Sequence, residues 1–304
     1  MPQSKYKVGD KAAYGLNLRL QPSKTSTSIG IIPMGTPVTK LGDSSAPDWW
    51  EVSTVVKDTP ATGFLNSTYL VPVADFTPPE QVSSITAVHM TPGNKKITRN
   101  GTSWAYPLNE TGQPGRNSAG TPQEKAADLT KIVKWLDVEH KVRYRHTSQA
   151  TFCNIYTYDY CYLAGVYLPR VWWLENAIAR LKAGKQVTPI YDDTVAEINA
   201  NSLVNWFNNY GPIFGWRRTV DLTELQSAAN DGQAAIICAQ HKVPNRHGHI
   251  CAVVPETSTQ KASRTGATVT SPLQSQAGAR EIQYFARNWW LNNHKNFGFW
   301  INGS

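Results

Sequence analysis

Glycine and proline interrupt residues 8–73 of this 304-residue chain about every ten residues. This spacing leaves room for short strands joined by turns and excludes long helices from the segment. Alternating or β-rich runs fill the intervals, namely Leu16–Leu20, Ile29–Ile32, Pro37–Leu41, Trp49–Val52 and Gly63–Leu65. We therefore expect a small all-β barrel of roughly 65 residues at the start of the chain.

The same segment resembles a bacterial SH3-like domain. The matching motifs are Leu16-Asn17-Leu18-Arg19 with Pro22, Ile29-Gly30, Met34-Gly35-Thr36, Trp49-Trp50-Glu51-Val52, Gly63-Phe64 and Tyr69-Leu70. The resemblance implies that residues 1–73 form an SH3-like cell-wall-binding domain without chemistry of its own. Residues 74–85 contain a Pro-Pro pair among polar residues, which predicts a short, stiff linker.

Residues 86–304 form the second predicted domain, in which helices precede most of the strands. Thr121, Pro122 and Glu124 form a capping box that begins a helix, and Gly165 ends a second helix that starts near residue 151. Further helices are expected near 173–183, 202–210 and 222–230, and strands over 234–240, 249–254, 267–276 and 297–301. This order predicts an α+β domain with an antiparallel sheet.

The formal net charge of +8 favours a polyanionic partner, such as nucleic acid, an anionic membrane or a bacterial wall. No nucleic-acid-binding motif accompanies the charge, so nucleic acid is not expected as a partner. No run of 18 apolar residues and no N-terminal signal sequence occur, which predicts cytoplasmic synthesis without a transmembrane segment. The four cysteines form neither a disulfide framework nor a Cys-x-x-Cys zinc pair, so we expect no metal and no cofactor. We expect a monomer.

Cys153 is the strongest candidate for a catalytic residue. It falls in the first turn of the predicted second helix, where unpaired backbone N–H groups and the helix dipole are expected to lower the pKa of a thiol. The same N–H groups can stabilise an oxyanion. Gln149, four residues earlier, is a candidate amide donor to that oxyanion, and Tyr144 in the same run is a candidate substrate contact.

A thiol nucleophile needs a base and a group that orients the base. His249 opens a β-branched strand, so its imidazole is expected at the rim of the sheet, where a helix start can meet it. If the strand over 267–276 pairs antiparallel with that strand, its end returns beside His249. The orienting residue is then Gln276, with Gln274 as the alternative, and His247 is a candidate substrate contact.

The second domain resembles papain-like cell-wall peptidases and amidases of the CHAP and NlpC type. The resemblance rests on Phe152-Cys153-Asn154 at a helix start and on the strand Gly248-His249-Ile250-Cys251-Ala252-Val253-Val254. It implies a papain-like cysteine hydrolase that cleaves an amide bond of the stem peptide or crossbridge of peptidoglycan. Together with an SH3-like domain it implies an endolysin-like protein, made in the cytoplasm and acting at the bacterial wall after release.

Two other functions stay open at this point. In the first, His247 and His249 are ligands of a zinc metallopeptidase, although no upstream histidine is followed by aspartate at the fourth position. In the second, the chain is a non-catalytic wall-binding or virion structural protein and the Cys/His pair is incidental. Reactivity of the Cys153 thiol separates this second function from the enzyme.

Overall fold

A computed structural model describes residues 5–12, 15–56, 59–76, 85–91, 93–99 and 106–304. The chain divides into two compact units, one of residues 1–81 with the short stretch 218–221, and one of residues 82–217 with 222–304. Most of the predicted linker, residues 77–84, lies outside the described residues. No described helix is long and apolar enough to cross a membrane.

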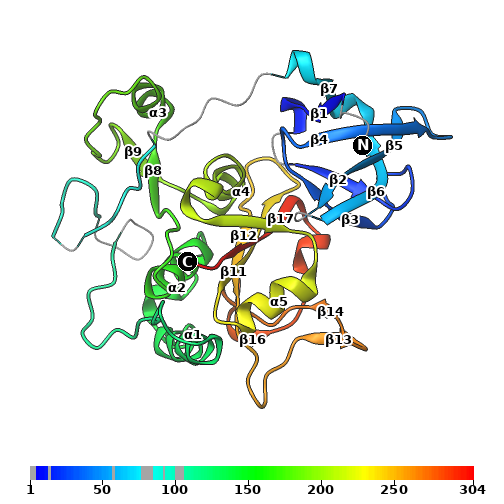
Figure 1. Ribbon diagram of the computed structural model, residues 1–304. Coiled ribbons are helices and arrows are strands. Elements are labelled where there is room, and N and C mark those ends of the chain that lie inside the picture. The colour runs from blue at the N-terminus through cyan, green and yellow to red at the C-terminus, as the bar shows by residue number, and fades with distance from the viewer. Residues whose placement is uncertain (1–4, 13–14, 57–58, 77–84, 92, 100–105) are drawn as a thin grey trace. The chain divides into compact units, whose positions relative to one another are not determined.

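The described part of the first unit is an antiparallel sheet of seven strands in the order β3-β2-β6-β5-β4-β1-β7 (Figure 1). Its strands are β1 (Tyr6–Val8), β2 (Leu16–Arg19), β3 (Ser28–Ile32), β4 (Pro37–Asp43), β5 (Trp49–Val56), β6 (Thr59–Asn66) and β7 (Leu70–Pro72). The longest pairing joins β5 to β6, from Trp49 opposite Asn66 to Val56 opposite Thr59. The five strands expected from the turn spacing are all confirmed.

Alternation along these strands builds the core of the first unit. Val38, Val52 and Leu65 are fully buried, each on a different strand, and they pack with Leu18 and Ile32. Burial of one face of each strand fixes the register, because a shift by one residue would expose the whole apolar set. The polar faces of the same strands remain available for contacts outside the core.

The second unit begins with helices, as expected. They are α1 (Pro122–Leu136), α2 (Cys153–Leu163), α3 (Glu175–Lys182), α4 (Ala200–Asn209) and α5 (Leu222–Asn230). The capping box is confirmed: the Thr121 side chain accepts from the backbone N–H of Glu124, and the Glu124 side chain accepts from Thr121. Gly165 has a φ of 74° just after α2, which is the conformation that ends a helix there.

Six strands of the described second unit form a sheet in the order β10-β17-β11-β12-β15-β16. The strands of the unit are β8 (Val171–Trp173), β9 (Val195–Glu197), β10 (Trp216–Thr219), β11 (Ala234–His241), β12 (His249–Val253), β13 (Ser263–Thr265), β14 (Thr268–Ser271), β15 (Gln274–Ala277), β16 (Glu281–Phe285) and β17 (His294–Asn302). The single strand expected over 267–276 is wrong. Pro272 interrupts it, β14 pairs with β13 in a separate hairpin, and only β15 joins the sheet beside β12.

The two faces of this sheet bury different helices. Ile236, Cys238, Ile250 and Ala252 share one core with α1, α2 and α4, while Cys251 and its neighbours share the other with α5. Helices α1 and α2 pack against each other on their side (Figure 1). Because side chains alternate along β12, its residues from Ile250 to Val253 divide between these two cores.

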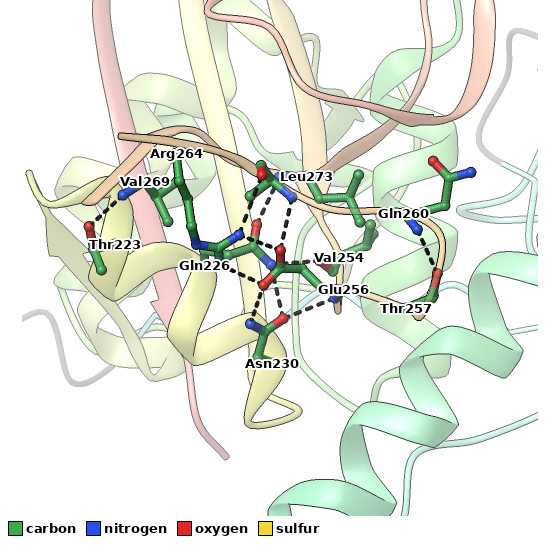
Figure 2. Close-up of polar contacts among 11 residues, drawn as sticks. Thr223, Gln226, Asn230, Val254, Glu256, Thr257, Gln260, Arg264, Val269 and Leu273 are labelled. Carbon is green, nitrogen blue, oxygen red and sulfur yellow. Dashed lines mark hydrogen bonds and ion pairs between the residues drawn. The ribbon is translucent and has the colours of Figure 1, made fainter. Parts of the chain in front are cut away.

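A polar network fixes the chain beyond the end of β12 (Figure 2). Glu256 accepts hydrogen bonds from Arg264 at 2.5 and 2.6 Å and from Asn230 at 2.8 Å. The amide of Gln226 on α5 donates to the Val254 carbonyl and accepts from the backbone N–H of Leu273. The Arg264 hydrogen bonds lower the pKa of Glu256 to about 2. These contacts tie the hairpin of β13 and β14 to α5.

Candidate active site

The thiol of Cys153 lies at the start of α2 and opens on a cavity of about 200 Å³. Phe152 precedes it as N-cap and contributes no side-chain hydrogen bond, while Oδ1 of Asn154 accepts from the backbone N–H of Ile155 at 3.1 Å. The backbone N–H groups of Cys153 and Asn154 act on the thiol itself. These two N–H groups lie beside the sulfur at the first turn of the helix.

The pKa of Cys153 departs from the expectation. Burial raises it, and this effect outweighs the opposing N–H groups of Ile250, Asn154 and Cys153 and the positive charge of Arg170. The helix start was expected to lower the pKa, but a side chain that is only 4% exposed loses more by leaving water than it gains from the dipole. The thiol is therefore protonated at neutral pH, and attack requires a base.

His249 and Gln276 are joined as the sequence predicted. The imidazole Nε2 of His249 lies 2.7 Å from Oε1 of Gln276. The other end of the same amide, Nε2 of Gln276, donates to the Arg280 carbonyl at 3.2 Å, which fixes the orientation of the amide. Because Oε1 can only accept, His249 carries its proton on Nε2 and leaves Nδ1 as the basic nitrogen.

The surroundings of His249 keep the imidazole neutral. Burial lowers its pKa to about 4, although the bond to Gln276 acts in the opposite direction. The ring of Trp289 packs edge-on against it with the centroids 4.5 Å apart. A Cβ on Gly278 would lie 3.2 Å from Cε1 of His249 and 3.1 Å from Nε2 of Gln276, so only glycine leaves the pair undisturbed. At pH 7 this imidazole is therefore neutral.

The structure brings Cys153 to the backbone on both sides of His249 but not to its imidazole. Gly248 lines the Cys153 cavity, and the backbone N–H of Ile250 acts on the thiol. His249 pairs with Ala239 on the face of the sheet that carries Cys251, whereas Cys153 packs with Ile250 on the other face. No hydrogen bond joins the two described side chains, so the expected direct Cys–His contact is absent from this conformation.

The remaining predicted site residues fall into two groups. Gln149 and His247 line the cavity with Cys153, and His247 is exposed. Tyr144 and Gln274 lie elsewhere. Tyr144 is fully buried and donates to Asp159 at 2.9 Å, and Gln274 accepts from the indole of Trp289 at 2.8 Å. Gln274 therefore holds the aromatic ring that covers His249, and it does not orient the imidazole.

Three polar residues of the cavity come from a later segment of the chain and were not predicted from the sequence as site residues. Arg170, Glu197 and Asn199 belong to the segment 166–232, which joins α2 to the sheet. Arg170 is 3% exposed and its guanidinium lies 3.1 Å from Oε2 of Glu197. Oε1 of Glu197 is buried without a hydrogen-bond partner. The available signal was Arg170, two residues before the Trp172-Trp173 pair, because an arginine buried among such apolar residues is almost always paired.

The polar side chains of this region do not form a metal centre. Among the residues that the structure describes, no group of three or more His, Cys, Asp or Glu side chains is placed to hold a metal ion. The cysteines 153, 161, 238 and 251 are all free and buried. The described cavity offers the Cys153 thiol, the exposed imidazole of His247, backbone N–H groups and the Arg170–Glu197 ion pair, while His249 lies on the other face of β12.

Comparison with known proteins bears on the first unit only. Residues 15–71 match the model of the bacterial SH3 domain family, so this part of the chain is a bacterial SH3 domain, a type that binds cell wall. No curated protein and no solved structure matches the chain significantly. The strands β2 to β6 and most of β7 lie inside the matched range.

Proposed function

We propose that this chain is a cell-wall-targeted cysteine hydrolase with a papain-like catalytic domain, which cleaves an amide bond in the peptide part of peptidoglycan. The observation that carries the proposal is the placement of Cys153 as the first residue of α2, open to a polar cavity, in a chain whose other unit is a bacterial SH3 domain. The SH3 domain would hold the enzyme at its polymeric substrate and raise the local concentration.

In the proposed reaction Cys153 attacks the amide carbonyl while its proton passes to Nδ1 of His249. The new S–C bond converts the carbonyl oxygen to an oxyanion, which the N–H groups of Cys153 and Asn154 stabilise. His249 returns the proton to the leaving nitrogen as the C–N bond breaks, and water then hydrolyses the thioester. Gln276 supports the cycle by holding the Nε2–H tautomer, since a neutral amide fixes the ring without storing charge.

Proton transfer from Cys153 to His249 requires the start of β12 to adjust when substrate enters, because the two side chains lie on different faces. His247 is a competing base, favoured by its place in the cavity that Cys153 lines. The two assignments make different predictions. If His249 is the base, held in place by Gln276, its loss abolishes turnover. If His247 is the base, loss of His247 abolishes turnover instead.

The test is mass spectrometry of purified peptidoglycan after digestion by the wild type and by Cys153→Ala, His249→Ala and His247→Ala. We expect fragments with new amino termini from the wild type, none from Cys153→Ala, and a strong loss with His249→Ala. Cys161→Ala is the matched control, since Cys161 is a fully buried thiol in the middle of the same helix. Equal release by the wild type and Cys153→Ala would reject the thiol mechanism.

A second function, wall binding without catalysis, is favoured by two observations. Burial raises the pKa of Cys153, and the imidazole of His249 does not contact it. A chain of this kind would bind sacculi and release nothing. The same digestion distinguishes the two functions, because a binding protein sediments with the wall and leaves the supernatant free of fragments.

A further inference from the structure

The bacterial SH3 domain contains a groove whose lining is basic. A cavity of about 400 Å³ is bordered by Lys11, Arg19 and Lys24, and none of the described residues that line it is acidic. Trp49, which is 8% exposed, and Tyr69 also line it. The guanidinium of Arg19 is held in place by a hydrogen bond to the Ser26 carbonyl. The groove therefore combines three cations with two aromatic side chains.

This concentration of positive charge is local. Residues 1–76 contain seven Lys and Arg and six Asp and Glu, so this stretch carries a net charge of only +1 of the +8 carried by the chain. A generally basic surface would spread its lysines evenly, but here three of the seven cations line one cavity and the carboxylates lie outside its lining. Charge separation of this kind focuses the field on one site.

The uncharged polar residues of the groove add to the same preference. Oδ1 of Asn17 accepts from the Ser28 hydroxyl at 3.0 Å, and Oδ1 of Asn66 accepts from the backbone N–H of Thr68 at 3.1 Å. Both amide oxygens are thus used inside the domain, and the NH2 ends remain as hydrogen-bond donors. A groove lined by donors and cations is complementary to a ligand with anionic acceptor oxygens.

We propose that this groove binds an anionic segment of bacterial cell wall through its phosphate or carboxylate oxygens. The inference rests on the wall-targeting part of the proposed function and is independent of the chemistry at Cys153. The cations engage the anionic oxygens, the asparagine amides donate to the same oxygens, and the aromatic side chains cover the apolar faces of the polymer. The SH3 domain then recognises the charge of the wall polymer as well as its shape.

The experiment measures binding of the full chain to purified sacculi in the Cys153→Ala background, so that the wall is not digested. The variant Lys11→Gln/Lys24→Gln removes two exposed groove cations. The control Lys5→Gln/Lys40→Gln removes the same charge from outside the lining of the groove. At low salt we expect the groove variant to bind about tenfold more weakly and the control to bind as the unmodified protein does. The difference should shrink in 0.5 M NaCl.

Acid extraction of the sacculi identifies the source of the anion. Weaker binding after removal of phosphodiester polymers assigns the groove to phosphate, and unchanged binding assigns it to the carboxylates of the peptide stems. Equal binding by the groove variant and the control would overturn the proposal that the groove is the binding site, while leaving wall targeting by the SH3 domain intact. Absence of binding by the parent protein would overturn both, whatever the outcome of the digestion experiments on Cys153.

Discussion

The hydrogen bond between His249 and Gln276 makes a prediction about charge that can be measured without any substrate. Replacing the amide by a carboxylate, in Gln276→Glu, places a negative group at the acceptor position 2.7 Å from Nε2 of His249. An opposite charge at this distance stabilises the imidazolium, and the pKa of His249 rises from its value of about 4.

The structure limits the size of that rise. A carboxylate within about 4–6 Å of a buried partner shifts a pKa by about 1–3. Nε2 of Gln276 donates to the Arg280 carbonyl at 3.2 Å, so one oxygen of the introduced carboxylate would face another oxygen. This repulsion opposes ionisation of the carboxylate, and we expect a rise in the lower half of the range, about 1–2.

The assay is long-range ¹H–¹⁵N NMR of protein with labelled histidine, recorded between pH 3 and pH 9. The wild type should show His249 with the proton on Nε2, and Gln276→Glu should move its midpoint upward. Gln260→Glu provides the charge control, because Gln260 lies in the loop beyond the opposite end of β12 (Figure 2). An unchanged midpoint in Gln276→Glu, or a wild-type proton on Nδ1, would refute the reasoning.

Three further predictions follow from named contacts. Gly278→Ala should destabilise the fold by about 1–3 kcal/mol in urea unfolding and broaden the His249 resonances, whereas Gly115→Ala, whose Cβ would have only the Leu163 carbonyl within 4 Å, should change neither. Glu256→Gln should lower the free energy of unfolding by about 1–3 kcal/mol at pH 7. Because the pKa of Glu256 falls from 4.5 to about 2 on folding, its contribution is complete above pH 4.5, and the gap between the two proteins should close as the pH falls toward 2. Alkylation of Cys153 by iodoacetamide should be slow at pH 7 and accelerate at alkaline pH, since burial raises its pKa; a fast plateau at neutral pH would contradict this. Slow alkylation at pH 7 is thus expected of both functions, and peptidoglycan digestion rather than thiol reactivity separates them.

The pH dependence of stability has a second contributor in His249. Its pKa is 6.5 in the unfolded chain and about 4 in the folded one, so the unfolded state binds the extra proton between these values. Stability is therefore highest above pH 6.5 and declines as the pH falls, by about 3 kcal/mol once the pH is below 4. His249→Phe should remove this part of the acid dependence in urea titrations.

Local signals in the sequence predicted much of this structure because they depend on near neighbours. The capping box at Thr121 and the glycine at 165 act within one helix turn, and the turns of the first unit act within a few residues. The position of Gln276 could also be predicted from the sequence, because antiparallel pairing of β12 and β15 brings the end of β15 toward the start of β12. Each of these predictions needed only the spacing of residues along a helix or strand, or the residues of a single turn.

The failures came from long-range packing. The face of β12 on which His249 lies depends on which helices cover each side of the sheet. Tyr144 does not contact the Cys153 cavity, because its hydroxyl donates to the buried carboxylate of Asp159. The raised pKa of Cys153 depends on how deeply α2 is buried, which a single helix start does not reveal. Arg170 and Glu197 meet only because β8 pairs with β9.

The most direct test of the central claim is capture of the covalent intermediate. Protein mixed with muropeptides is quenched in acid within seconds, digested, and its Cys153 peptide is weighed by mass spectrometry. We predict a thioester adduct on Cys153 whose mass equals the acyl part of the cleaved peptide, and a longer-lived adduct when hydrolysis is slowed by cold. Release of peptide fragments without any adduct, and at the same rate from Cys153→Ala, would contradict the account.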